Sequence, residues 1–124
     1  MSKIALFPGS FDPITVGHVD IVIRSLDLFD KIIVGVGHNS QKNYMFPLQD
    51  RIDWIKACFE EYPQVEVKTY SGLTVDYCKE VNARFILRGL RTSVDFEFEK
   101  SIGQMNRYLE SGIETIFLLS APQY

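Results

Sequence analysis

Hydrophobic residues gather into short runs along the chain, and these runs are rich in β-branched or aromatic residues. The runs cover residues 4–7, 32–36, 65–67, 85–87 and 116–119. Short apolar runs of this kind are typical of strands that are buried on both faces of a sheet. The pattern therefore predicts five buried strands.

The segments between these runs have helical periodicity. Apolar side chains recur at spacings of three and four residues, which places them on one face of a helix. One such stripe comprises Val16, Val19, Ile23 and Leu26, and a second comprises Leu48, Ile52, Ile55 and Phe59. A third helix is expected to begin at Thr74. A long helix is expected over residues 92–111, with Gly112 as its C-terminal stop.

Alternating strands and helices predict right-handed β-α-β crossovers and a parallel sheet. The expected fold class is therefore α/β, with a Rossmann-like, doubly wound, five-stranded parallel sheet in a single domain that spans residues 1–124. Sheets of this class bind ligands at the carboxyl ends of their strands. This rule directs attention to the loops after Phe7, Gly37, Tyr70 and Leu87.

The last predicted strand ends at Leu119, close to the end of the sequence at Tyr124. A doubly wound domain usually covers such a strand with a further helix, and no helical segment follows here. Two explanations stay open. Either the sequence is a fragment, or a partner subunit covers this edge of the sheet.

Composition and charge exclude several classes of function. The formal net charge is −3, so the chain lacks the basic field that binds a nucleic-acid backbone, and no nucleic acid is expected as a partner. No apolar stretch reaches membrane-spanning length, and the N-terminus does not resemble a signal peptide. The cysteines, Cys58 and Cys78, have neither zinc-binding nor redox spacing and are interpreted as reduced core thiols. We therefore expect a cytoplasmic protein with no membrane partner.

The first predicted strand runs into a turn rich in Gly, Ser, Asp and Pro, and a helix follows it. Unpaired N–H groups and the helix dipole make such a helix start a site for an anion. Gly9 and Gly17 permit close approach of the backbone, and Ser10 adds a hydroxyl. His18 lies in the first turn, where a helix N-terminus favours the neutral imidazole. Considered alone, His18 is better explained as a surface or capping residue, and the surrounding loop reverses that preference.

A second polar group follows the fourth predicted strand. Arg88 and Arg91 lie at a carboxyl strand end, where guanidinium groups suit bidentate recognition of phosphate. Arg91, Asp95 and Glu99 are spaced four apart and share one helix face. This face is either an ordinary ladder of ion pairs on the surface or an edge that faces a nucleotide.

The remaining polar signals are weaker. The chain has no GxxxxGK[ST] motif, and Gly35 and Gly37 only partly match a dinucleotide-binding motif because no helix follows them directly. Lys42 lies in a polar loop, where a solvated side chain is the usual outcome. Thr74 is well explained as a helix-capping residue.

Considered together, the motifs resemble those of the bacterial phosphopantetheine adenylyltransferases of the HxGH nucleotidyltransferase superfamily. The resemblance extends over nearly the whole chain and rests on PGSFDPITVGH at 8–18, Lys42, RGLR at 88–91, DFEFE at 95–99 and MNR at 105–107. Thr15 stands at the first histidine of HxGH, a variation typical of the family. Phe98 stands where many relatives have tyrosine.

The resemblance implies roles for individual residues. ATP would be bound by Ser10, Phe11, His18, Gly89, Leu90, Arg91, Glu99 and Tyr124, with His18 as the transition-state stabiliser. The second substrate, 4′-phosphopantetheine, would be bound by Ser10, Lys42, Thr74 and Arg88. Family members continue past an aromatic residue like Tyr124 into a loop that binds ATP phosphates and into further helices, which are absent from this sequence.

The implied reaction joins ATP and 4′-phosphopantetheine to give dephospho-coenzyme A and pyrophosphate, a step of coenzyme A biosynthesis. The attacking group is an ionised phosphate, so no protein nucleophile is required. Mg²⁺ would accompany the triphosphate, with no metal site built from side chains. The family resemblance also implies a homohexamer. Three alternatives stay open: another nucleotidyltransferase of the superfamily, a catalytically weak or silent nucleotide- or pantetheine-binding fragment, and a purely structural subunit of an oligomer.

Overall fold

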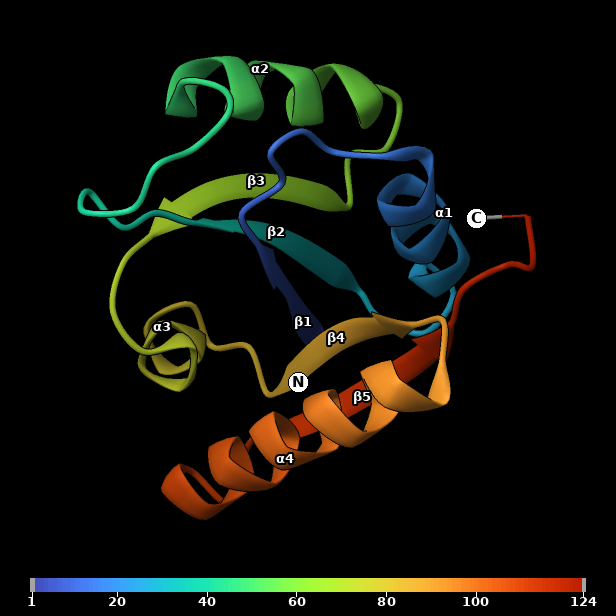
Figure 1. The fold of residues 1–124 in the computed structure, drawn as a ribbon. Coiled ribbons are helices and arrows are strands. Elements are labelled where there is room, and N and C mark those ends of the chain that lie inside the picture. The colour runs from blue at the N-terminus through green and yellow to red at the C-terminus, as the bar shows by residue number, and fades with distance from the viewer. Residues whose placement is uncertain (1, 124) are drawn as a thin grey trace.

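A computed structural model describes residues 2–123, apart from the side chains of residues 93 and 94. Within these residues, five strands alternate with four helices (Figure 1). The strands are β1 (Ile4–Gly9), β2 (Lys31–Gly37), β3 (Val65–Tyr70), β4 (Phe85–Leu90) and β5 (Glu114–Leu119). The helices are α1 (Val16–Ser25), α2 (Leu48–Cys58), α3 (Thr74–Glu80) and α4 (Ser93–Leu109).

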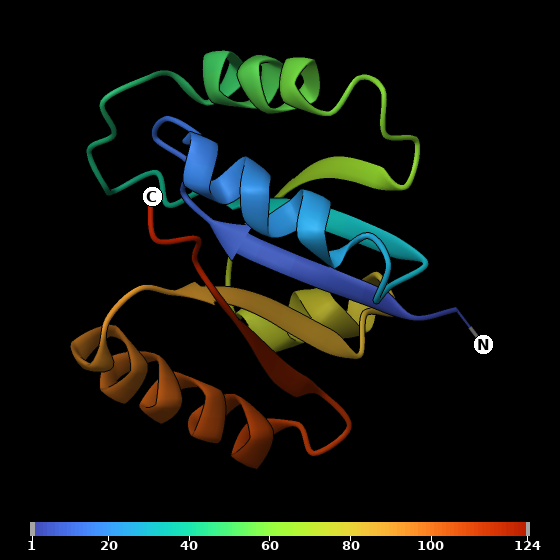
Figure 2. The same ribbon diagram turned by 90° about the vertical axis from the view of Figure 1, so that its right-hand side faces the viewer.

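The strands form one parallel sheet in the order β3-β2-β1-β4-β5, which Figure 2 shows from top to bottom. The chain winds outward from β1 to β3, crosses back to β4 and then continues to β5. The predicted doubly wound α/β class is therefore confirmed. The winding direction reverses between β1 and β4, and a crevice is expected at the carboxyl ends of these two strands.

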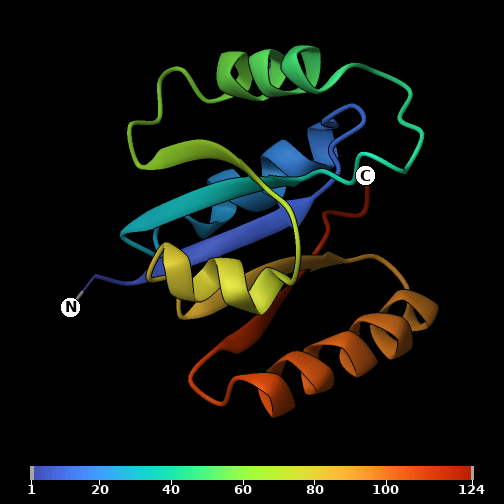
Figure 3. The ribbon, with the colours of Figure 1, turned by 90° about the vertical axis from the view of Figure 1, so that its left-hand side faces the viewer.

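Helices cover both faces of the sheet. Ala5 and Phe7 of β1 belong to a core cluster that also contains residues of α1 and α2, whereas Leu6 belongs to a second cluster with residues of α3. Figure 3 shows α3 in front of the strands and α1 behind them. The alternation of side chains along β1 thus divides the core into two layers.

The predicted apolar stripe of α1 is confirmed only in part. Val19 and Leu26 pack against the first core cluster, whereas Val16 is 67% exposed and Ile23 is 37% exposed. The fully buried residues of this helix are Ile21, Val22 and Ser25, none of which the stripe included. Ser25 can lie on the inner face because its hydroxyl donates a hydrogen bond to the Ile21 carbonyl at 2.6 Å, which offsets the cost of burying the hydroxyl.

The predicted stripe of α2 is confirmed. Ile55 and Phe59 are buried, and Leu48 and Ile52 pack against the same core cluster. The buried face includes one residue that the stripe did not contain, Arg51, whose exposure is only 1%.

Burial on both faces is confirmed for β2 and for most of β1, but not for the edge strands. Within β3 and β5 every residue is half-buried or exposed. Each edge strand has a neighbour on one side only, and Leu119 at the end of β5 is 74% exposed. The apolar run therefore identified the strand without revealing its position in the sheet.

The two cysteines have different environments. Cys78 is buried, as predicted, and burial raises the pKa of its thiol to about 11, so the thiol stays protonated. Cys58 is exposed at the end of α2, so its assignment to the core is wrong.

The long helix α4 ends at Leu109, two positions before the predicted end, because the backbone of Glu110 is already extended. None of the helices within the described residues combines the length and the apolar character that a bilayer crossing demands.

Gly35 in β2 leaves room for two neighbouring side chains. A Cβ atom at this position would lie 2.6 Å from Cδ1 of Leu6 and 3.1 Å from Cε1 of Tyr70. Leu6 is fully buried, so it cannot turn away into solvent. The absence of a side chain at Gly35 therefore allows Tyr70 to lie over the sheet.

We predict that Gly35→Ala lowers the free energy of unfolding by about 1–3 kcal/mol, because the added methyl overpacks the core around Leu6. Urea unfolding at equilibrium measures the change. Gly112→Ala is a matched control, since a Cβ at Gly112 meets no atom within 4 Å. The control should change the stability by less than about 0.5 kcal/mol. Equal effects of the two substitutions would contradict this account of Gly35.

Candidate active site

A large cleft opens at the reversal point of the sheet. Its volume is about 740 Å³, and its walls come from the β1–α1 loop, the first turn of α1, the end of β4 and the start of α4. Its lining includes Ser10, Phe11, His18, Arg88, Gly89, Arg91 and Glu99. Residues that are far apart in the sequence, His18 on one side and the two arginines on the other, therefore share one cleft.

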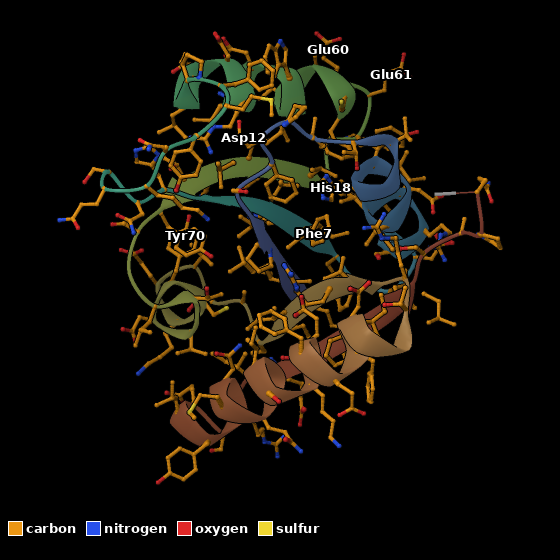
Figure 4. The ribbon with its side chains drawn as sticks, in the orientation of Figure 1. Phe7, Asp12, His18, Glu60, Glu61 and Tyr70 are labelled. Atoms are coloured by element: carbon orange, nitrogen blue, oxygen red, sulfur yellow. The ribbon has the colours of Figure 1, made fainter. Side chains whose placement is uncertain are left out.

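A smaller cleft of about 300 Å³ lies on the other side of the β1–α1 loop. Its lining includes Ser10, Lys42, Thr74 and Arg88, the residues predicted to bind the second substrate. Tyr70 also lines this smaller cleft, and Figure 4 shows Tyr70 and His18 on opposite sides of β1.

The two clefts meet at a shared boundary. Pro8, Gly9, Ser10, Arg88 and Glu99 line both of them. A group bound in one cleft can therefore contact a group bound in the other at this boundary. The arrangement suits a reaction between two ligands.

Among the described residues of the predicted ATP set, Leu90 is absent from the linings of both clefts. Leu90 is only 6% exposed, because the alternation of side chains along β4 turns it into the core. Its carbonyl accepts a hydrogen bond from the N–H of Ser120 at 2.8 Å. The Leu90 side chain therefore faces the core, and the predicted role of Leu90 in binding ATP stays a prediction that concerns its backbone. Tyr124 lies outside the described residues.

His18 is part of the N-terminal cap of α1. The backbone N–H of Thr15 donates to Nδ1 of His18 at 3.0 Å, and the N–H of His18 donates to Oγ1 of Thr15 at 3.3 Å. A backbone amide can only donate, so Nδ1 is an acceptor and the proton of the neutral imidazole is on Nε2. Thr15 and His18 form a reciprocal capping box. The histidine is thus both a capping residue and a residue of the large cleft.

Three factors lower the pKa of His18. Burial is the largest, and the positive charges of Arg88 and Arg91 act in the same direction. The ring also makes edge contacts with Phe7 and Phe11, at centroid distances of 6.1 and 5.0 Å. The predicted direction of the pKa shift is confirmed, although its largest cause is burial. The neutral imidazole offers Nε2–H as a hydrogen-bond donor.

The position of the Phe11 ring explains why residue 9 is a glycine. Its backbone has a φ of 47°, and its ring is buried against Phe7. A Cβ at Gly9 would lie 3.0 Å from the Phe11 ring, closer than a side chain can normally approach. The turn therefore combines a glycine with a phenylalanine in the left-handed region, which costs about 1–2 kcal/mol.

Arg88 is held by three hydrogen bonds. Its Nη2 and Nε donate to the two carboxylate oxygens of Glu99, at 2.6 and 3.2 Å, and its Nη1 donates to the Pro8 carbonyl at 2.6 Å. This bidentate pair fixes the plane of the guanidinium group. Glu99 therefore pairs across the cleft with Arg88. Of the two alternatives left open for this helix face, the ladder of surface ion pairs therefore does not hold for Glu99.

The described residues contain no group of three or more His, Cys, Asp or Glu side chains that could hold a metal ion. Asp12, Asp95 and Glu99 supply carboxylates to the large cleft. Both oxygens of Glu99 accept from Arg88, and both oxygens of Asp12 accept from the N–H groups of Met45 and Phe46, which leaves Asp95 as the freest carboxylate of the three.

The sequence patterns did not identify two residues that hold the loop after β2. The Asp12 carboxylate accepts hydrogen bonds from the N–H groups of Met45 and Phe46, and Arg51 donates to the Phe46 carbonyl. A signal for Arg51 was present, because it lies three residues after Leu48 and thus on the buried face of α2. A charged residue at such a position indicates internal polar partners.

Comparison with known proteins identifies the family. A family model described as cytidylyltransferase-like matches residues 6–120. A phosphopantetheine adenylyltransferase of Christiangramia forsetii is 60% identical over 119 residues, which are 96% of this chain and 78% of that protein. A protein of the same name from Cytophaga hutchinsonii is 54% identical over 122 residues, 98% of this chain and 81% of the relative.

Solved structures share the fold at low sequence identity. A lipopolysaccharide core biosynthesis protein of Thermoplasma volcanium superposes with a TM-score of 0.65 at 21% identity, over 98% of each chain. A bifunctional NMN adenylyltransferase/ADP ribose pyrophosphatase of Francisella tularensis, complexed with AMP and a manganese ion, superposes with a TM-score of 0.68 at 16% identity. That match covers 98% of this chain and 38% of the other.

The family model spans most of the chain, and the curated relatives are similar over nearly all of it. The expected Rossmann-like fold is present in the structure and in the solved neighbours. The resemblance noted from the sequence motifs is therefore confirmed. The chain belongs to the cytidylyltransferase-like family and, within it, to the phosphopantetheine adenylyltransferases.

Proposed function

We propose that this chain transfers the adenylyl group of ATP to 4′-phosphopantetheine, with dephospho-coenzyme A and pyrophosphate as products. One observation carries the proposal: two clefts of different size meet at Ser10 and Arg88. Adenylyl transfer needs two ligands whose phosphates meet at one point. The names of the curated relatives support the identity of these ligands.

We assign ATP to the large cleft. The residues that would contact it are Ser10, Phe11, His18, Gly89, Arg91 and Glu99, together with the backbone of Leu90 and with Tyr124. Backbone N–H groups at the start of α1 support this assignment, because they favour an anion. Arg91 adds a positive charge on the opposite wall.

We assign 4′-phosphopantetheine to the smaller cleft. Lys42 and Arg88 would bind its phosphate, and Ser10 and Thr74 would contribute hydroxyl groups. The Thr74 hydroxyl already shares a hydrogen bond of 3.0 Å with the Tyr70 hydroxyl, so its orientation is fixed. The position of Arg88 at the boundary would bring the acceptor phosphate next to the ATP.

The mechanism follows from these positions. An oxygen of the acceptor phosphate attacks the α-phosphorus of ATP, a new P–O bond forms, and the bond to pyrophosphate breaks. Lys42 and Arg88 orient the attacking phosphate. The Nε2–H of His18 and the amide groups at the start of α1 donate to oxygens of the α-phosphate, where they stabilise the transition state. No covalent intermediate with the protein is needed.

Mg²⁺ is proposed as the cofactor. A large cleft with one freer carboxylate, Asp95, fits a metal ion that enters with the triphosphate and keeps phosphate and water ligands. When bound, Mg²⁺ neutralises part of the phosphate charge. We expect calorimetry to show Mg²⁺ binding only in the presence of ATP, and EDTA to abolish activity. Tight Mg²⁺ binding without ATP would contradict this proposal.

Self-association is also proposed, as a homohexamer. Exposed apolar side chains support it, since Phe98, Met105 and Tyr108 on α4 are 68, 56 and 87% exposed. Analytical ultracentrifugation measures the state, and a monomer at micromolar concentration would exclude it. Both cysteines are unpaired, which supports the proposed cytoplasmic location.

Two rival functions are distinguishable by experiment. Another nucleotidyltransferase of the superfamily would release pyrophosphate with a different acceptor, which a panel of acceptors would show. A silent binding fragment would bind both ligands in calorimetry without forming product. The similarity to the curated relatives extends over 96 and 98% of this chain and does not favour the silent fragment.

We predict that His18→Ala lowers kcat about 100- to 1000-fold, because a donor to the transition state is lost. The dissociation constant for ATP should change by less than about tenfold, since the donor acts mainly in the transition state. Steady-state kinetics and calorimetry measure the two effects. Thermal unfolding controls for the loss of the capping box with Thr15. A variant with weaker ATP binding and unchanged kcat would refute the assigned role.

We predict that Lys42→Met and Arg91→Met affect different substrates, because Lys42 lines the small cleft and not the large one, whereas Arg91 lines the large cleft and not the small one. Lys42→Met should raise KM for 4′-phosphopantetheine about 10- to 100-fold, and Arg91→Met should raise KM for ATP by a similar factor. Initial-rate kinetics with each substrate varied give both constants. If either variant raises both constants equally, the assignment of one substrate to each cleft is wrong.

A further inference from the structure

Arg51 is the largest fully buried side chain of the described residues, with an exposure of 1%. It lies in α2, outside the linings of both clefts. None of the ion pairs within the described part of the chain includes it. A buried arginine normally requires a carboxylate partner, so its presence here calls for another explanation.

The guanidinium group of Arg51 contacts two loops. Its Nη1 donates to the Ser10 carbonyl at 2.8 Å, and its Nε donates to the Phe46 carbonyl at 3.1 Å. Its Nη2 lies 3.3 Å from Nδ1 of His38, which must be the acceptor because arginine has none. The group also lies over the Tyr44 ring, 4.1 Å from the centroid. Thus one contact reaches the β1–α1 loop, and three reach the β2–α2 loop.

The β2–α2 loop carries residues of the small cleft. Tyr44 and Lys42 line this cleft, and both are connected to Asn39: the Asn39 N–H donates to the Tyr44 hydroxyl at 2.9 Å, and the Lys42 N–H donates to the Asn39 carbonyl at 3.0 Å. The Tyr44 ring stacks on Arg51. Arg51 is therefore linked to Lys42 through Tyr44 and Asn39.

The choice of arginine at this position is explained by its geometry. Methionine would fill much of the same volume without the cost of burying a charge. Only the planar fork of arginine, with its five N–H donors, can bind two carbonyls and an imidazole while its face stacks on an aromatic ring. The contacts of Arg51 therefore tie two loops together at a fixed distance.

We propose that Arg51 is a positioning residue that holds the β2–α2 loop against the β1–α1 loop and so places Lys42 and Tyr44 for the phosphate-bearing acceptor. This role rests on the proposed function, since it assigns the small cleft to the acceptor. Arg51 contacts neither substrate. Its effect passes through Ser10 on one side and through Tyr44 on the other.

The test compares Arg51→Met and Arg51→Lys with a matched control, Lys56→Met. The control removes a positive charge from an exposed position of the same helix. Arg51→Lys keeps the positive charge and loses the planar guanidinium group, so it separates the effect of the charge from that of the hydrogen-bond geometry. It also remains available for the test if Arg51→Met does not fold. Circular dichroism and thermal unfolding establish that each variant is folded at the assay temperature.

Arg51→Met should raise KM for 4′-phosphopantetheine about tenfold and lower kcat about tenfold, while KM for ATP changes less than about threefold. Arg51→Lys should show the same pattern with a smaller effect. Lys56→Met should match the unsubstituted protein. The single tryptophan, Trp54, packs edge-on against Phe46 at 4.9 Å, so its fluorescence should shift in both Arg51 variants.

A folded Arg51→Met or Arg51→Lys variant with a lower melting temperature and unchanged kinetic constants would overturn the positioning role and leave only a structural one. An equal rise of both KM values would also overturn it. Failure of the proposed function is recognised separately: the unsubstituted protein would then form no dephospho-coenzyme A from ATP and 4′-phosphopantetheine. In that case the Trp54 signal alone would still report whether Arg51 holds the loop.

Discussion

The polarity of the parallel sheet determines the position of both clefts. All five strands end at the same edge, and the chain reverses its winding direction on the two sides of β1. The loop after β1 lies at this reversal point and lines two clefts, although the β2–α2 loop packs against it through Asp12 and Arg51. Ser10 in this loop lines both clefts for that reason. A two-substrate site thus follows from the topology before any catalytic side chain is considered.

Charges at the boundary of the clefts act on one another at short range. The bidentate pair with Glu99 holds the Arg88 guanidinium in place, and the positive charge of Arg88 still helps to lower the pKa of His18. Burial is still the largest cause of the lowered His18 pKa, because it penalises the charged imidazolium, and the charges of Arg88 and Arg91 act in the same direction. Burial and the residues that would bind phosphate therefore both favour the neutral histidine. A neutral imidazole whose Nδ1 is already occupied can act only as a donor from Nε2.

Much of this structure could be predicted from the sequence, since it depends on local patterns. Apolar runs located the five described strands, and the glycine- and arginine-containing turns located much of the large cleft and its boundary with the small one. Lys42 and Thr74 of the small cleft were singled out only by the family resemblance. The remainder depends on specific hydrogen-bond partners. Ser25 can be buried because its hydroxyl donates to a carbonyl of its own helix, and the two alternatives for the face of Glu99 are separated only by its pairing with Arg88 on another element. Neither partner is visible in hydrophobic periodicity.

The two arginines with buried contacts illustrate how environment determines the use of one side chain. Arg88 faces the clefts and is fixed by a carboxylate, which leaves part of its charge available to a ligand. Arg51 is fixed by carbonyls and an aromatic face, and its bond to the Ser10 carbonyl orients the peptide that joins Ser10 to Phe11. In a trans peptide the N–H points opposite to the carbonyl, so the Phe11 N–H is directed away from α2. The buried cation thus orients a backbone dipole in the loop that both clefts share, although it lies in neither cleft.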